Sequence, residues 1–230
     1  MIKSRLCQLI YRCIYLGLAF FGILESFGLL AGQKPSLECM IWYTSLSNFL
    51  CFGIMIALVY TTAKHIKYNE LYGESNNVGK LKFYSSIAIF VTFIVYNFIL
   101  VDNMFSEGWN NLGNLTKHII CPLMFVIDGI LFDEHHKLTV LDPLKCTILP
   151  LIYVAFILIR GAFLNPETYQ GTIYPYFFLD VNNLGYFGVF KWVLILVIVF
   201  IIIAYLFFFY DKFEKEEGKF SFDLGSIKNN

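Results

Sequence analysis

The sequence predicts an all-α fold, a polytopic membrane helix bundle of about six transmembrane helices. Hydrophobic residues make up 58% of the 230 residues and charged residues 15%, with a mean hydropathy of +0.65. A soluble domain of this size would carry more charge. The apolar residues also form long runs between polar clusters, without the periodicity of a soluble core. Lipid is therefore the expected solvent for most of the chain.

Six apolar runs are long enough, at a rise of about 1.5 Å per residue, to cross a hydrocarbon layer of about 30 Å. We place them at Leu9–Ala31, Met40–Ala63, Phe83–Val101, Leu112–Phe132, Cys146–Phe163 and Tyr186–Tyr210. Together they form a single transmembrane domain over residues 1–212. The remaining residues, 213–230, are predicted to be a polar cytoplasmic tail.

The first run has to be distinguished from a secretory signal peptide, because Lys3 and Arg5 precede it. It is too long for a signal peptide, contains Glu25 and ends without a small-x-small cleavage site. We therefore expect it to be retained as the first span.

The later runs differ in regularity. A polar loop at residues 64–82, rich in turn-forming residues, separates the second from the third. His118 and Asp128 interrupt the fourth run, and Pro150 and Arg160 interrupt the fifth. The sixth contains the continuous apolar stretch VLILVIVFIIIAYLFFF, which makes it the clearest span of the six.

The cations predict the orientation, because translocation of Lys and Arg across a membrane is disfavoured. Of the 17 Lys and Arg residues, one side of the predicted spans holds only Lys34, Lys117, Arg160 and Lys191. We therefore expect both termini to be cytoplasmic. The localisation that follows is a multi-pass protein of the cell membrane.

Charge and cysteine content argue against several classes of function. The formal net charge is zero, and no basic face interleaved with aromatic residues indicates nucleic-acid binding. The six cysteines occur singly, without metal-ligand or redox spacing. Asp128 and the segment Phe132–His136 supply carboxylates and imidazoles, but these straddle the cytoplasmic boundary. We expect no metal and no cofactor.

The loop at residues 164–185 is unusually aromatic, with Tyr174, Tyr176, Phe177 and Phe178 close together. Such residues suit the headgroup layer, where an apolar ring and a polar edge are both satisfied. We expect this loop to lie in the outer interface like a lid.

Polar side chains inside the spans are candidates for a site, because each costs free energy unless it faces protein or water. Thr44 lies about four residues into the second span and His118 about six into the fourth, so both are about 6–9 Å below the outer boundary. Polar residues of three other spans reach this layer or lie one turn from it. The predicted outer-leaflet chamber is lined by Glu25, Thr44, Asn48, Asn97, His118 and Arg160.

This set of residues has a possible chemistry. A neutral His118 imidazole could take the proton of the Thr44 hydroxyl as that oxygen attacks an ester. Asn48, or a backbone amide, could donate to the oxyanion, and Arg160 could attract a carboxylate head group.

The alternative is structural. A Thr within a span usually bonds to a carbonyl one turn back, and a His near the headgroups is often a plain interfacial residue. Glu25 and Arg160 are better explained as a structural ion pair than as catalytic groups.

Several motifs occur in order along most of the chain: WYTSLSN at 42–48, HIICP at 118–122 leading to Asp128, PLIY at 150–153, RG at 160–161, YPY at 174–176, FLD at 178–180 and Gly185. As a series they resemble the Pr-six-Pr family of bacterial membrane proteins, which has no settled activity. That family is distantly similar to the androgen-induced membrane proteins of animals, which hydrolyse fatty-acid esters of hydroxy fatty acids with an intramembrane Thr and His. The resemblance implies the six-span fold and assigns these roles to Thr44 and His118. The chain departs from the animal pattern at Pro122 and in the YPY loop.

Three functions remain open. The first is hydrolysis of a lipid ester by Thr44 and His118, with substrate bound by Asn48, Arg160, Glu25 and Asn97. The second is non-catalytic lipid binding or transport through the same pocket, and the third is a purely structural role. Membrane lipids are the expected partners, and the sequence does not predict an oligomeric state.

Overall fold

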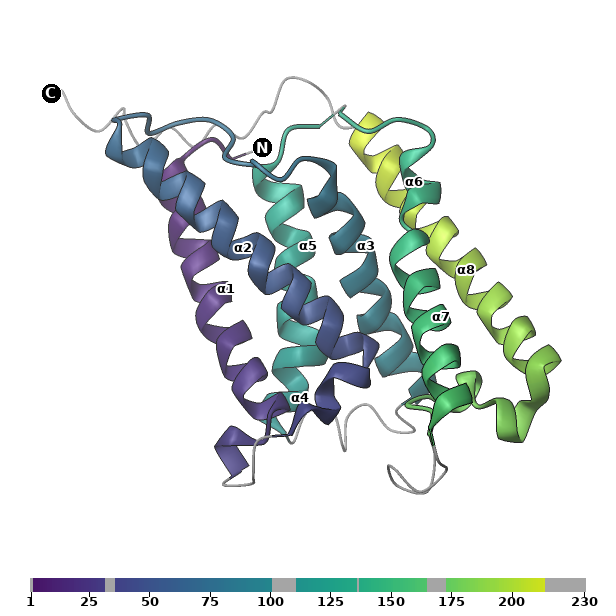
Figure 1. Ribbon diagram of the computed structural model, residues 1–230. Coiled ribbons are helices and arrows are strands. Elements are labelled where there is room, and N and C mark those ends of the chain that lie inside the picture. The colour runs from purple at the N-terminus through teal and green to yellow at the C-terminus, as the bar shows by residue number, and fades with distance from the viewer. Residues whose placement is uncertain (1, 32–35, 101–110, 136, 165–172, 214–230) are drawn as a thin grey trace, which may run out of the picture.

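The structure is a computed structural model that describes residues 2–31, 36–100, 111–135, 137–164 and 173–213 (Figure 1). In this part of the chain the only strand-like pairing is an isolated bridge between Ser4 and Tyr72. Six helical segments are long and apolar enough to cross a membrane. The predicted all-α membrane helix bundle is therefore confirmed.

The six spans are divided into eight α-helices and two π-helical turns. The first and second spans are α1 (Arg5–Ser26) and α2 (Tyr43–Lys67). The third is α3 (Lys80–Val95) with the π-helical turn Tyr96–Leu100. The fourth consists of α4 (Leu112–Leu115), the π-helical turn Thr116–Ile120 and α5 (Cys121–Phe132). The fifth and sixth are α6 (Asp142–Lys145) with α7 (Ile148–Phe163), and α8 (Val181–Phe213). Short 3-10 turns lie at Leu29–Ala31, Leu37–Ile41 and Phe177–Leu179.

Capping residues explain why two helices begin before the predicted apolar runs. The Ser4 hydroxyl accepts a hydrogen bond from the first turn of α1 at 3.5 Å, so the helix starts four residues early. Asp180 accepts one from the first turn of α8 at 2.9 Å, so that helix starts five residues early. A kink follows at Gly185, whose φ of 65° glycine adopts without steric cost.

The helices α1, α2, α3 and α5 pack together as a bundle, and α7 and α8 flank it (Figure 1). In the bundle, α1 packs along α2, and α3 packs against both α2 and α5. Its core includes Tyr15, Met55, Leu58, Ile89 and Phe125, all fully buried. The flanking pair, α7 and α8, lies beside α3 (Figure 1).

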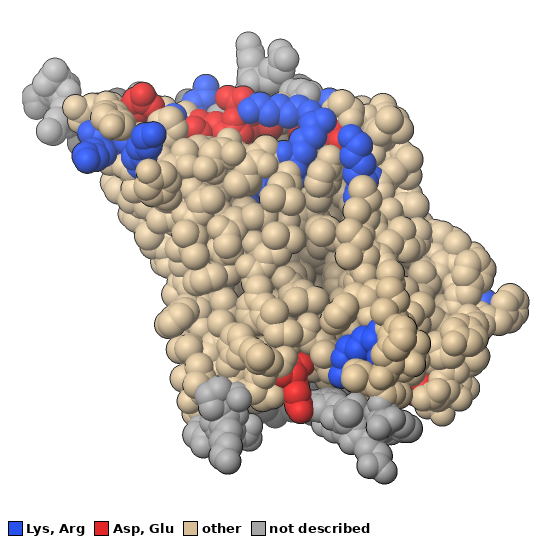
Figure 2. Space-filling view, viewed as in Figure 1, with Lys and Arg blue, Asp and Glu red and all other residues tan. Residues whose placement is uncertain are grey.

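Charged side chains gather at the end of the bundle where α1 begins and α8 ends (Figure 2). We call this the cation-rich end. Below it, the band of surface seen in Figure 2 is apolar until a few charges reappear near the opposite end. This separation agrees with the cation asymmetry of the sequence, and the cytoplasmic location of the cation-rich end stays a prediction.

An ion network crosses the bundle within its cation-rich half. Asp128 of α5 accepts hydrogen bonds from Arg12 at 2.9 and 3.2 Å and from Lys82 at 2.5 Å. Arg12 also donates to the Thr62 hydroxyl at 2.8 Å, and Lys82 donates to Asp133 at 2.6 Å. The network therefore joins α1, α2, α3 and the C-terminal end of α5. By sequence, Arg12 and Lys82 are simply two of the cations on the side expected to be cytoplasmic, and no local pattern pairs them with Asp128.

The network contains two cations and two carboxylates, so its formal charge is zero. Arg12, Lys82 and Asp128 are at most 1% exposed. A buried charge without a partner is strongly destabilising, which explains why each cation reaches a carboxylate. Asp133 lies just beyond the span, where burial raises its pKa to about 6 although Lys82 lowers it.

The substitution Asp128→Asn should destabilise the bundle by about 3–5 kcal/mol, because Arg12 and Lys82 would stay buried with one carboxylate fewer. Unfolding in detergent can be followed with a thiol-reactive fluorophore, since four of the six cysteines are buried in the folded protein.

Glu134→Gln is the matched control. Glu134 and Lys137 are 2.9 Å apart but about half exposed, so losing this pair should cost only about 0–1 kcal/mol. An Asp128→Asn protein as stable as the wild type would show that the network does not hold the bundle together.

Candidate functional site

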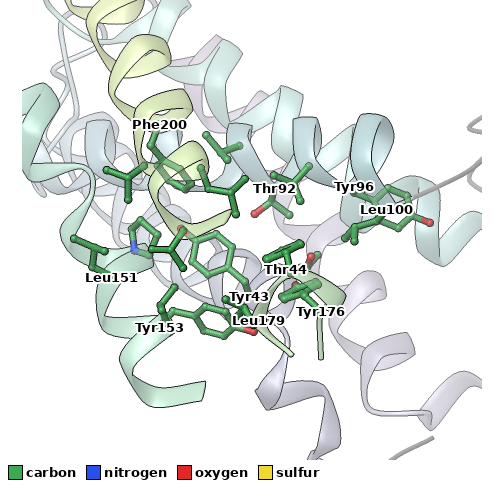
Figure 3. Close-up of a pocket in the computed structure, with 18 residues that line it drawn as sticks. Tyr43, Thr44, Thr92, Tyr96, Leu100, Leu151, Tyr153, Tyr176, Leu179 and Phe200 are labelled. Atoms are coloured by element: carbon green, nitrogen blue, oxygen red, sulfur yellow. The ribbon is translucent and has the colours of Figure 1, made fainter. Parts of the chain in front are cut away.

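Two cavities meet near the end of the bundle opposite the cation-rich end. We call the first the polar chamber; it has a volume of about 540 Å³. Its polar lining comprises Glu25, Ser26, Ser36, Glu38, Cys39, Thr44, Ser45, Tyr96, Lys117, His118 and Tyr176. We call the second the apolar slot, which lies between α3, α7 and α8 (Figure 3). Its lining includes Val91, Val95, Leu151, Val154, Leu196 and Phe200.

Four residues line both cavities: Thr44, Tyr96, Leu100 and Tyr176. Figure 3 shows these labelled residues on the side of the slot away from Leu151. The polar chamber and the apolar slot are therefore neighbours that share a wall.

Three of the six predicted site residues line the polar chamber: Glu25, Thr44 and His118. The His118 ring stacks on Tyr96, with centroids 3.5 Å apart and planes 11° apart. In the described part of the chain, His118 Nδ1 is buried without a hydrogen-bond partner, so it makes no hydrogen bond to Thr44. Thr44 and His118 thus face one space without forming a hydrogen-bonded pair through Nδ1.

Asn48 lies behind the chamber wall and binds backbone. Its Nδ2 donates to the carbonyls of Thr44 at 2.9 Å and Lys117 at 3.1 Å. The Lys117 carbonyl needs this donor because, in the π-helical turn Thr116–Ile120, the N–H of Cys121 donates to the first carbonyl of the turn instead. Both amide hydrogens of Asn48 are occupied, which leaves none to donate to an oxyanion.

Asn97, like Asn48, binds backbone carbonyls with its side-chain amide. Pro122 has no N–H, so the His118 carbonyl one turn earlier lacks its usual helical donor. Asn97 Nδ2 donates to that carbonyl at 3.4 Å and to the Phe93 carbonyl at 2.7 Å. Asn97 therefore positions the turn that carries His118.

Glu25 and Arg160 do not form an ion pair with each other, so that prediction from the sequence is wrong. Glu25 forms an ion pair with Lys117, and its side chain lies against Gly113, where an added Cβ would be 2.5 Å from Glu25 Cδ. Arg160 Nη1 instead donates to the Ile173 carbonyl at 2.8 Å. Lys117, which directly precedes His118, was not among the predicted residues of this site.

The two tyrosines of the YPY motif pack into the protein. Tyr174 and Tyr176 are each 7% exposed. The Tyr174 ring covers Gly161 of α7, where an added Cβ would be 2.5 Å from the ring. Tyr176 lies edge-on to Trp42, with centroids 5.4 Å apart. The YPY motif thus forms a packed wall. Residues 165–172 of that loop lie outside the described residues, and the position of the loop in the outer interface stays a prediction.

The Tyr176 phenol faces the start of α2. Burial raises its pKa, while the Thr44 hydroxyl and the backbone N–H groups of Thr44 and Tyr43 lower it. Among the described residues no side chain caps this helix at Trp42. The positive end of the α2 dipole therefore lies beside the shared wall.

Asp128 belongs to the ion network of the other half of the bundle and not to this site. Within the described ranges, no three His, Cys, Asp or Glu side chains are grouped so that they could hold a metal ion. The polar chamber therefore has to act through hydroxyl, imidazole, ammonium and carboxylate groups.

Gly161→Ala should displace Tyr174 and loosen the wall formed by the YPY motif, because the new methyl group would overlap the ring. We expect several-fold faster labelling of Cys39 by a membrane-impermeant maleimide. Cys39 lines the chamber, is buried, and has a pKa raised by burial, so it reacts slowly in the wild type. The label is quantified by peptide mass spectrometry.

Gly53→Ala is the control, since nothing lies within 4 Å of the added Cβ. Cys51 is fully buried in the core and should stay unlabelled, which separates local opening from unfolding. Equal Cys39 labelling in both variants would contradict the role of the Tyr174 contact.

Comparison of the chain with protein-family models, with characterised proteins and with solved structures finds no match. The resemblance to the Pr-six-Pr family therefore still rests on the ordered motifs alone.

Proposed function

We propose that the protein binds a single-chain amphiphile, with its polar head in the polar chamber and its hydrocarbon chain in the apolar slot. The observation that carries this proposal is the shared wall of Thr44, Tyr96, Leu100 and Tyr176. A ligand with one polar and one apolar end matches the two linings, because polar groups cost free energy when left in an apolar space.

The cavities also favour a particular kind of amphiphile. The slot is much smaller than the chamber, about 70 Å³ against about 540 Å³, which suits one chain better than two. Glu25 neutralises Lys117, and the exposed Glu38 adds a negative charge at the chamber. An uncharged head with hydroxyl groups, as in a 1-acylglycerol, fits this balance better than a carboxylate.

Val95→Trp should weaken binding of radiolabelled 1-decanoylglycerol at least about 10-fold, because the indole would fill the slot. Binding is measured by scintillation proximity on tagged protein in lipid nanodiscs. Leu196→Trp, on the α8 wall of the slot, should have the same effect and replaces Val95→Trp in the test if that variant does not fold.

Phe98→Trp is the matched control, since Phe98 lies three residues further along the same span and is 71% exposed. It should bind as the wild type does. Equal binding by all three variants would exclude the slot as the binding site. If the two slot variants fail to fold and the wild type binds no ligand, a purely structural role is favoured.

Ester hydrolysis is a second candidate function, favoured by one specific observation. Thr44 lines both cavities, so its hydroxyl lies where the head of a bound ester would join the chain. His118 lines the same chamber. The motifs that resemble the animal membrane hydrolases point to the same two residues.

The reaction would proceed in two steps. The Thr44 oxygen attacks the ester carbonyl carbon while its proton passes to the His118 imidazole, which then protonates the departing alcohol. Water next attacks the acyl-threonine and gives a proton to the imidazole, which passes it to the departing Thr44 oxygen as the carboxylic acid is released. Since Asn48 has no free hydrogen, the candidate oxyanion donors are the backbone N–H groups at the start of α2, where an oxyanion would replace the Tyr176 phenol as their acceptor.

Wild-type protein should be labelled by a serine/threonine-directed fluorophosphonate, and Thr44→Val should not be. Valine keeps the branched shape of threonine but removes the nucleophile. Ser36→Ala is the control, because it removes another hydroxyl from the chamber lining. Labelling that persists in Thr44→Val, or is absent from the wild type, would reject hydrolysis while leaving amphiphile binding intact.

A further inference from the structure

We infer that the apolar slot selects its ligand by chain length, accepting a chain of about ten carbons, and that Phe200 sets the limit. This inference rests on the proposed binding of a single-chain amphiphile. It concerns the far end of the slot, away from the polar chamber.

The length of the slot follows from the helices that line it. On the third span the lining extends from Leu100, which also borders the chamber, to Val91. These residues are nine positions apart, so this wall is about 13 Å long. On α8 the lining extends over seven positions from Val193 to Phe200, or about 10 Å. An extended chain advances about 1.2 Å per bond, so walls of this length match a chain of roughly eight to eleven bonds.

The inner end of the slot is closed by protein. Phe200 is 4% exposed, and its ring contacts that of Tyr43, with centroids 6.4 Å apart. Beyond it lies a packed cluster that includes Ile87, Cys146 and Ala204. A chain longer than the slot would therefore meet the Phe200 ring.

Phe200 is also the residue whose truncation would lengthen the slot most directly. Ala204 lies one turn further along the same face of α8 and has the smallest side chain of the cluster. Removing the Phe200 ring would open space toward Ala204, about 6 Å further along the helix axis. That distance corresponds to about four or five additional bonds.

The test is competition by 1-acylglycerols with even-numbered chains, from octanoyl to hexadecanoyl, against radiolabelled 1-decanoylglycerol in nanodiscs. The wild type should bind the decanoyl compound best and the hexadecanoyl compound at least about 10-fold more weakly. In Phe200→Ala the optimum should move to chains about four carbons longer. Phe200→Leu, which leaves more of the side chain, should give a smaller shift and serves if the alanine variant does not fold.

Ile202→Ala is the control, because Ile202 is on α8 but 55% exposed, and its optimum should equal that of the wild type. Failure of every acylglycerol to bind the wild type would overturn the proposed binding function itself. Binding without dependence on chain length, or an unchanged optimum in both Phe200 variants, would overturn only the selection by length.

Discussion

The structure depends on one carboxylate. Asp128 accepts hydrogen bonds from both Arg12 and Lys82 within an apolar bundle, where any of these charges alone would be strongly destabilising. The contacts fix α1 and α3 against α5, and Thr62 adds α2. The network thus ties the helices together in the cation-rich half, while the polar chamber lies near their opposite ends.

The chamber depends on a second constraint: buried backbone N–H and C=O groups need hydrogen-bond partners. The π-helical turn Thr116–Ile120 and Pro122 release two carbonyls from the helical pattern, and the amides of Asn48 and Asn97 bind them. These amides act on the backbone, which holds Lys117 and His118 at the cavity. A polar residue inside a span can therefore serve a site without contacting the ligand.

Hydropathy predicted the spans well because lipid imposes length and composition directly on the chain. Helix ends were predicted less well, since Ser4 and Asp180 extend helices through single hydrogen bonds. Counting residues from the membrane boundary assigned Thr44 and His118 to one layer, because the helical rise is constant. The depth of a residue in the membrane does not specify which way its side chain points around the helix axis, so the partner of Glu25 could not be predicted. Arg12 and Asp128 are 116 positions apart, and no local pattern relates them.

The same ion network has a consequence for biogenesis. Arg12 is synthesised 116 residues before Asp128, and Lys82 is synthesised 46 residues before it. During translation, the first and third spans therefore carry cations that have no carboxylate partner until the fourth span follows. The early spans gain their final charge balance only when α5 joins them, which makes late assembly of the bundle a cooperative step and not a sequential addition of finished helices.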